Sequence, residues 1–319
     1  MEQLFNKLNE IIGEYDNFII MGHKKPDLDS IGSSLGLYNV IKKFQKNAYI
    51  YLDTSELGNY NNNFNQAIVQ LRKSVNFIDT DINSTNTLVI VTDVHIKSRV
   101  GCEELIDKYD VVVLDHHIKD KDYIKNSKYM YIDSKLSSMS ELLTYYLEYL
   151  NIDIDVITAT IMLAGIEIDT NGFNLKTSSS TYEAASILMD KGADTILKQE
   201  LLKETKEEYL KRVNFIKTSF MVNKETAMCI VNKKVTNVDL AEIAEELLTF
   251  EEVKASYVIG KLDTNIIGIS ARSLGEIDVS IVIKQLGGGG HMSNAATQIK
   301  DKTIKEVKQE LTKLILNEN

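Results

Sequence analysis

Tryptophan is absent from this chain of 319 residues, proline occurs once and cysteine occurs twice. The two cysteines, Cys102 and Cys229, are far apart and lack the spacing of a metal site, so we expect reduced thiols in a cytoplasmic protein. Long hydrophobic runs are also missing, because none approaches the ~18 residues that indicate a membrane helix. The first 18 residues form an acidic amphipathic segment, which predicts a helix and not a signal peptide.

The chain has fewer basic than acidic residues: it contains 36 Lys and Arg residues and 46 Asp and Glu residues, so its formal net charge is −10. This balance disfavours a long basic channel for polymeric nucleic acid. It leaves room for a short nucleotide in a local basic pocket, and it agrees with a site that holds divalent cations. Acidic residues spread over the surface would produce the same excess.

The first two thirds of the chain alternate between short apolar runs and helical patterns. Three runs are continuously apolar, as is typical of parallel strands covered on both faces: 17–21, 87–91 and 110–114. Helices or buried core runs are expected between and after them: 28–46, 140–150, 156–168 and 181–191. Alternating strands and helices predict an α/β domain with a mostly parallel sheet.

A charged segment without glycine or proline follows at 195–220, where we expect one connecting helix. After it, the patterns predict a smaller α+β domain with the strands 226–231, 255–261 and 265–272 and the helices 239–249, 278–286 and 303–316. We therefore divide the chain into a first domain (1–194), a helical linker (195–222) and a second, smaller domain (223–319).

The single proline, Pro26, lies in "GHKKPDLDS" among His23, Asp27 and Asp29. Similar polar groups follow the next two predicted strands: Asp93 and His95, then Asp115, His116 and His117. In a parallel sheet these positions share the C-terminal edge, where ligands bind. Carboxylates and imidazoles without thiolates favour Mn²⁺ or Mg²⁺ over a structural zinc, and the number of aspartates predicts a two-metal hydrolase site.

Each of these residues taken alone has an ordinary explanation. An isolated aspartate in a turn is usually a turn or cap residue, and an isolated histidine is usually packed or exposed. The joint pattern is what predicts a site, and Asp169, which ends the apolar run 161–168, could join it. His95 and Asp115 fit the ordinary explanation better than the others. Asp115 could instead orient a neighbouring histidine.

Small residues mark three further segments. Gly32, Ser33 and Gly36 would let a helix approach the sheet closely or present its N-terminal amides to an anion. The run "GGGG" (287–290), with His291 and Arg272 adding charge, could form a phosphate-binding nest, or it could be a flexible hinge. The stretch "SSMSE" (137–141) predicts a helix N-cap with the features of a capping box, and it could also touch phosphate.

Four motifs, "GHKKPDLDS", "VTDVH", "LDHH" and "GIEIDT", resemble the metal motifs of the DHH phosphoesterase superfamily, and "GGGGHMSNAATQ" resembles the glycine-rich motif of its associated C-terminal domain. Within that superfamily, long stretches resemble the catalytic module of GdpP-type cyclic-di-AMP phosphodiesterases. The histidine of "DVH" also matches that subgroup better than the nanoRNase branch, which usually has glycine there. The resemblance covers nearly the whole chain.

The resemblance implies a role for each matching position. Metal one would be held by His23 and Asp27, metal two by Asp29, His116 and Asp169, with Asp93 bridging both. His117, Asp93 and Asp115 would be catalytic, with His117 pointing toward the scissile phosphate. Substrate contacts would come from His95 and, in the second domain, from Arg272, Ser273, Gly287, Gly288, Gly289, Gly290 and His291.

The same resemblance implies a reaction and its cofactors. Two divalent ions, Mn²⁺ first and Mg²⁺ second, would generate a hydroxide that attacks phosphorus and opens cyclic di-AMP to pApA. The substrate would be a small nucleotide, either a cyclic dinucleotide or a dinucleotide. The oligomeric state is left open, with a homodimer among the alternatives.

This sequence differs from GdpP-type proteins in two respects, and these differences leave other hypotheses open. The subgroup usually has an "RTGSRT"-like run where this chain has "KTSSST" (176–181), so Ser178 replaces a glycine and Ser180 an arginine. A nanoRNase/pAp phosphatase that cleaves short oligonucleotides, pApA or pAp is therefore the alternative. An inactive nucleotide sensor and a pyrophosphatase are more distant ones. GdpP proteins also carry membrane, sensory and cyclase-like domains ahead of this module, so the chain is either a stand-alone member or a part of a longer protein.

Overall fold

The structure is a computed structural model that describes residues 1–53 and 61–318. The chain divides into two compact units, Met1–Lys203 and Glu204–Asn319, which are described separately. Among the described residues, no helix is both long enough and apolar enough to cross a membrane.

The first unit is built on a six-stranded sheet in the order β3-β2-β1-β4-β5-β6, and every pairing in it is parallel. Its strands are β1 (Asn17–Met21), β2 (Asn47–Tyr51), β3 (Phe77–Ile78), β4 (Thr87–Thr92), β5 (Asp110–Asp115) and β6 (Tyr129–Ile132). In the central strands Met21 pairs with Val91, and Thr92 pairs with Leu114. The segments that follow β1, β4 and β5 therefore leave the sheet at the same edge.

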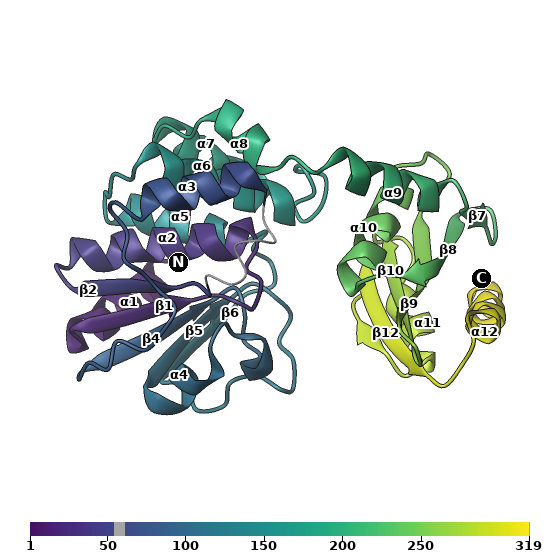
Figure 1. Ribbon diagram of the computed structural model, residues 1–319, viewed down its shortest axis with the longest axis horizontal. Coiled ribbons are helices and arrows are strands. Elements are labelled where there is room, and N and C mark those ends of the chain that lie inside the picture. Colours follow the sequence, from purple (N-terminus) through teal and green to yellow (C-terminus); the bar gives the residue numbers. More distant parts are fainter. Residues whose placement is uncertain (54–60, 319) are drawn as a thin grey trace. The chain divides into compact units, whose positions relative to one another are not determined.

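Helices cover both faces of this sheet unequally (Figure 1). They are α1 (Glu2–Glu14), α2 (Leu28–Lys43), α3 (Asn62–Leu71), α4 (Glu103–Lys108), α5 (Met139–Tyr149), α6 (Val156–Asp169), α7 (Ser179–Asp190) and α8 (Thr195–Leu201), with a 3-10 turn at Lys97–Arg99. One core joins alternate strand residues such as Phe18 and Ile20 to α1, α2, α3, α5 and α6. The other face, which includes Ile19 and Met21, packs on α4 and the adjoining loops. The expected α/β architecture is confirmed.

The sheet order has a consequence for the position of a site. The chain leaves β1 toward β2 on one side and returns to β4 on the other side of β1. Such a reversal of strand order opens a crevice at the C-terminal edge, which is where doubly wound folds bind their ligands. The predicted polar clusters lie at this edge.

The second unit contains a six-stranded mixed sheet in the order β11-β12-β10-β9-β8-β7. The strands are β7 (Phe220–Met221), β8 (Thr226–Lys234), β9 (Ala255–Asp263), β10 (Ile266–Ser273), β11 (Gly289–Gly290) and β12 (Asn294–Lys300). Its helices are α9 (Lys206–Ile216), α10 (Asn237–Leu247), α11 (Val279–Gln285) and α12 (Ile304–Asn317). The helices α11 and α12 pack in a core on one face of the sheet, and α10 packs on the other.

The expectation of one helix over 195–220 is wrong. The helix α8 ends at Leu201, and α9 begins after Thr205, whose side chain accepts a hydrogen bond from the amide of Glu208. The carboxylate of Glu208 accepts one in return from the amide of Thr205, which completes a capping box. The side chain of Asn61 also donates to the carbonyl oxygens of Leu201 and Lys203, which satisfies groups at the end of α8.

Candidate metal centre

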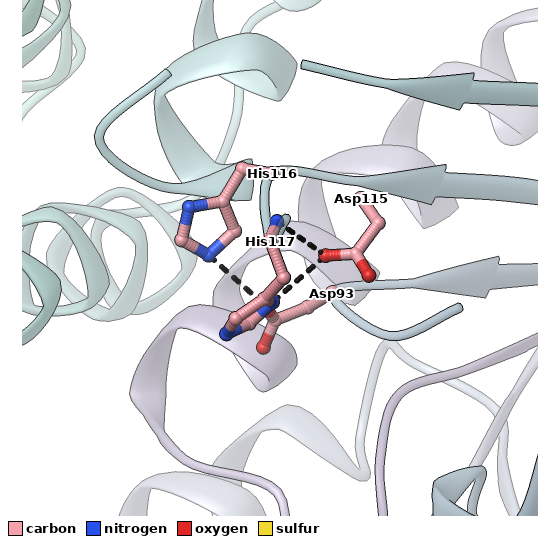
Figure 2. A group of neighbouring side chains, drawn as sticks. All are labelled: Asp93, Asp115, His116 and His117. Carbon is pink, nitrogen blue, oxygen red and sulfur yellow. Dashed lines mark hydrogen bonds and ion pairs between the residues drawn. The ribbon is translucent and has the colours of Figure 1, made fainter. Parts of the chain in front are cut away.

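Asp93 belongs to every group of predicted ligands that the structure brings together. Among the described residues, three groups of acidic and histidine side chains have ligand atoms within 4.8 Å of one another, and Asp93 is a member of each. Figure 2 shows the group of Asp93 with Asp115, His116 and His117. The groups are His23, Asp27 and Asp93; Asp29, Asp93, His116 and Asp169; and Asp93, Asp115, His116 and His117. The first two are the sets that the resemblance assigns to metal one and metal two, with Asp93 between them.

The first group is formed by the turn between β1 and α2. The His23 Nε2 atom lies 3.5 Å from Asp27 Oδ2 and 3.4 Å from Asp93 Oδ2. Asp27 is also the N-cap of α2, because its Oδ1 accepts hydrogen bonds from the amides of Asp29 and Ser30. One oxygen of Asp27 therefore starts the helix while the other faces His23. Asp93 follows β4 with a φ of 65°, a left-handed backbone that aims its carboxylate at the group.

The second group is buried except for Asp169, which is partly exposed. The His116 Nε2 atom lies 3.0 Å from Asp169 Oδ2, 3.2 Å from Asp93 Oδ1 and 3.9 Å from Asp29 Oδ2. Within the described residues, Asp93 Oδ1 and both ring nitrogens of His116 nevertheless make no hydrogen bond of acceptable geometry. Buried polar atoms without partners are costly. Unpartnered atoms of this kind, from the segments that follow β4 and β5, fit a bound cation.

The electrostatics of these side chains also favour a bound cation. Burial, together with the charges of Asp169 and Asp93, raises the pKa of Asp29 well above its usual range. The pKa of Asp169 is raised as well, mainly by burial. Burial lowers the pKa of His23, but the carboxylates of Asp27 and Asp93, which accept from its ring, outweigh burial and raise that pKa to about 11. Like charges crowded in one buried site favour protonated forms, and a divalent cation would relieve this repulsion.

Asp29 is held by a partner that the sequence did not reveal. The amide of Met139 donates to its Oδ2 and the amide of Ser140 donates to its Oδ1, each at 2.7 Å. These amides form the first turn of α5, where the helix dipole also favours a negative charge. The predicted N-cap is confirmed at Ser138, but the amides beyond it bind this carboxylate, whereas the sequence suggested phosphate.

Two glycines let the elements of this site approach one another. A Cβ atom on Gly165 of α6 would lie 2.7 Å from the Cα of Asp29, and one on Gly32 of α2 would lie 2.9 Å from the Cα of Met162. The backbones of α2 and α6 are therefore in near contact beside Asp29. Of the two roles considered for Gly32, close helix packing and anion binding, the structure supports close packing.

Glu141 is a buried carboxylate, 1% exposed, that was not predicted. Its oxygens accept hydrogen bonds from the amide and hydroxyl of Ser137, from the hydroxyl of Ser180 at 2.8 Å and from that of Thr181 at 3.1 Å. In a capping box the Glu141 carboxylate would accept from the amide of the N-cap residue Ser138, but here it accepts from the amide of Ser137. Glu141 ties the start of α5 to the start of α7.

The third group places Asp115 between two histidines. Its Oδ1 accepts from the Nδ1 of His117 at 2.8 Å and from the amide of His117 at 3.0 Å, and its Oδ2 contacts the Nδ1 of His95. Burial opposes ionisation, but the hydrogen bonds from both histidines outweigh it and hold the pKa of Asp115 well below its usual range. The side chain of His117 is 54% exposed, so it can meet a ligand. His95, predicted to contact substrate, is buried.

With this geometry in place, the chain can be compared with known proteins. The family model described as "DHH family, N-terminal domain" matches residues 17–166, and the DHHA1 domain matches residues 221–317. The chain belongs to the DHH family. The DHH match contains the first predicted ligands, His23 to His117, and ends shortly before Asp169.

Three known proteins illustrate the similarity. The chain is 37% identical to the cyclic-di-AMP phosphodiesterase GdpP of Bacillus subtilis (strain 168), over 95% of this chain and 48% of that protein. It is 27% identical to the bifunctional oligoribonuclease and PAP phosphatase NrnA of Mycoplasma genitalium, over 96% of each chain. A crystal structure of an exopolyphosphatase-related protein from Bacteroides fragilis shares the fold, with a TM-score of 0.79, 19% identity and coverage of 100% of this chain and 98% of that one. The chain spans about half the length of GdpP.

The DHHA1 domain holds the remaining predicted residues close together at one end of its sheet. Arg272 pairs in register with Asn294, and the amide of Ser273 donates to the carbonyl oxygen of Ser293. The Ser273 hydroxyl donates to the carbonyl oxygen of Met292 at 3.0 Å. Ser273 therefore holds the turn that follows the glycine run. Arg272 donates from Nε to Glu245 at 2.9 Å, and its side chain is 18% exposed.

The glycine run of the DHHA1 domain is partly ordered by its neighbours. Gly289 and Gly290 form the short strand β11 and pair with β12. A Cβ atom on Gly288 or Gly290 would lie 2.4 Å from backbone atoms of β12, and Gly287 has a φ of 78°. Close packing and turn geometry account for these three glycines. His291 is exposed beside them.

Proposed function

We propose that this DHH protein is a two-metal phosphodiesterase that hydrolyses cyclic di-AMP to pApA. The observation that carries the proposal is the convergence of the two ligand groups on Asp93. Two metal positions that share a carboxylate are the usual arrangement for hydrolysis of a phosphate ester. The similarity to GdpP supports cyclic di-AMP as the substrate.

The same proposal includes the ions. His23, Asp27 and Asp93 would hold one of them, and Asp29, Asp93, His116 and Asp169 would hold the other. Oxygen-rich ligand sets with imidazole and no thiolate favour Mn²⁺, with Mg²⁺ second. When bound, such ions neutralise charge on the phosphate and lower the pKa of a water molecule that serves as the nucleophile.

Residues near the metal ligands would orient the catalytic histidine and contact the substrate. The Nδ1 atom of His117 is directed at Asp115, so its Nε2 atom lies on the opposite side of the ring, where it can contact an oxygen of the scissile phosphate. Asp115 fixes the orientation of that ring. Arg272, Ser273 and the segment Gly287–His291 would contact the nucleotide, with Arg272 and His291 supplying charge.

The decisive experiment is a comparison of substrates. The purified protein is loaded with Mn²⁺ or with Mg²⁺ and incubated with cyclic di-AMP, pApA, short RNA or pAp, and the products are separated by chromatography. We expect pApA from cyclic di-AMP, fastest with Mn²⁺. If cyclic di-AMP stays intact while pAp or dinucleotides are cleaved, the proposal is wrong.

A nanoRNase/pAp phosphatase is the second candidate, and one observation favours it. The hydroxyl of Ser178 caps α7 and that of Ser180 donates to Glu141, so both bind within the protein where the GdpP-type run has a glycine and an arginine. The similarity to NrnA, which extends over nearly all of both chains, agrees with it. Production of AMP from pAp in the same experiment would identify this activity.

The proposal also includes the cellular compartment in which the protein acts. Cys102 and Cys229 form no disulfide, which agrees with a reducing compartment, and cyclic dinucleotides are intracellular substrates in this proposal. We therefore propose a cytoplasmic site of action. Alkylation of Cys102, the partly exposed thiol, by a membrane-impermeant reagent only after cell lysis would support it.

A further inference from the structure

His95 uses both of its ring nitrogens inside the protein. Its Nδ1 contacts the carboxylate of Asp115, and its Nε2 accepts a hydrogen bond of 2.8 Å from the amide of Asp120. The side chain is buried, with the whole residue 2% exposed. A direct contact between this imidazole and a substrate would require one of these two bonds to break.

The bond to Asp120 settles which tautomer is present. An amide can only donate, so the Nε2 atom of His95 must carry a lone pair. A neutral imidazole then carries its proton on Nδ1, which donates it to Asp115. His95 is thus a donor on one side and an acceptor on the other, and the two sides serve different segments.

The segment on the acceptor side directly follows His117. The carbonyl oxygen of His95 accepts from the amide of Ile124 at 2.8 Å, and Ile96 forms an isolated bridge with Tyr123. Together with the bond to Asp120, these contacts hold the loop 118–123 against His95 and Ile96. The loop carries two exposed cations, Lys119 and Lys121, immediately after the exposed imidazole of His117.

We infer that His95 is a positioning residue with two separable effects. Through Nδ1 it fixes the Asp115 carboxylate, whose other oxygen aligns His117. Through Nε2 it holds the loop 118–123, so that Lys119 and Lys121 meet the negative charge of the substrate. The first contact governs the rate of the chemical step, and the second governs substrate binding. This inference rests on the proposed phosphodiesterase function.

Two substitutions separate the effects. In His95→Asn, the side-chain amide nitrogen occupies the place of Nδ1 and keeps the bond to Asp115, but nothing remains to accept from Asp120. In His95→Gln, the side-chain oxygen can take the place of Nε2, and the bond to Asp115 is lost. We expect His95→Asn to raise KM with kcat little changed, and His95→Gln to lower kcat by about tenfold or more, as for other groups that orient catalytic residues.

Thr160→Val is the matched control. The buried hydroxyl of Thr160 accepts a hydrogen bond of 2.8 Å from the amide of Asp194, a tether of the same kind that lies away from the ligand groups. We expect this variant to lower the melting temperature and to leave kcat and KM unchanged. If both His95 variants behave like Thr160→Val, or if they change kcat and KM alike, the inference is wrong.

A second readout does not depend on activity. In the ¹⁵N-labelled, metal-free protein, two-bond nitrogen–proton correlations report the tautomer of each histidine. We expect His95 to carry its proton on Nδ1, and a proton on Nε2 would overturn the inference. Kinetics are measured on cyclic di-AMP and on bis(4-nitrophenyl) phosphate. If wild-type protein cleaves only the latter, the proposed substrate fails while the kcat effect of His95→Gln is still tested.

Discussion

The backbone amide of Ser140 donates a hydrogen bond of 2.7 Å to the carboxylate of Asp29, which lies 111 positions earlier in the chain. The amide of Met139 binds the other oxygen of the same carboxylate at 2.7 Å. The position of a predicted metal ligand therefore depends on how α5 packs against the start of α2. Gly165 of α6 also packs closely against Asp29.

Replacing Gly165 with alanine should disturb Asp29 without touching its side chain. The added Cβ would lie 2.7 Å from the Cα of Asp29 and 2.9 Å from the carbonyl oxygen of Leu28, so the backbones must separate. We expect a loss of about 1–3 kcal/mol in the free energy of unfolding and weaker Mn²⁺ binding, measured by denaturation and calorimetric titration. Gly13→Ala is the control, because its Cβ would meet nothing within 4 Å. Equal metal affinity in Gly165→Ala and wild type would contradict this.

Asp93→Asn should remove the shared ligand and preserve the fold. Asparagine tolerates the left-handed backbone that Asp93 adopts, so the substitution changes charge more than conformation. We expect turnover to fall by a hundredfold or more, since even residues behind the ligands cost ~10–100-fold. The thermal stabilisation by Mn²⁺ should also disappear. Unchanged turnover with an intact circular dichroism spectrum would argue against a two-metal site.

The stability of the metal-free protein should fall as pH rises. The pKa of His23 is about 11 in the folded protein, and that of His116 is also raised, since its contacts with Asp169 and Asp93 outweigh burial. Above about pH 6.5 the unfolded chain releases these protons while the folded protein keeps them, so the stabilisation is lost progressively. Denaturation at about pH 6.5 and about pH 8.5 measures this slope.

His23→Asn is the control for that slope, which should become shallower. Mn²⁺ must displace the same protons, so the increase in melting temperature that it causes should be larger at the higher pH. A metal-free protein that is more stable at the higher pH would refute the assignment.

Ser273→Ala should weaken substrate binding more than catalysis. The buried Ser273 hydroxyl donates to Met292 and accepts from the amide of Gly275, so its loss frees the turn beside His291. We expect KM for cyclic di-AMP to rise several-fold and kcat to change little. Ser256→Ala, which removes a hydrogen bond of 2.6 Å from a fully buried serine of the same domain, should lower stability alone. Equal KM values in the two variants would contradict the role of Ser273.

The sequence predicted the central strands and the ligand groups because both follow simple patterns. Continuous apolar runs gave β1, β4 and β5 almost to the residue, and the topology of a parallel sheet brings their C-terminal ends together. The side chains expected at this edge lie close together around Asp93, and their role as metal ligands stays a prediction. Strands such as β2 (Asn47–Tyr51) were missed because their runs are short and mixed with polar residues.

Other features had weak or ambiguous signals. The break between α8 and α9 was overlooked, although Thr205 and Glu208 have the spacing of a capping box. Asp29 is held by the backbone amides of Met139 and Ser140, and because every residue except proline has such an amide, the sequence gives no sign of this contact. His95 has the same appearance in sequence whether it faces a substrate or a buried carboxylate. Only the fold, which places it against Asp115 and Asp120, distinguishes the two.

The predicted metal ligands lie in one compact unit, and the predicted substrate contacts other than His95 lie in the second. All the expected metal ligands precede Lys203, whereas Arg272, Ser273 and the glycine run follow Glu204. The two sets rest on different hydrophobic cores. Under the proposed function, substitutions around β10 and β11 would alter nucleotide preference and leave the metal ligands intact. In evolutionary terms, such an enzyme would acquire a new substrate while its chemistry stayed the same.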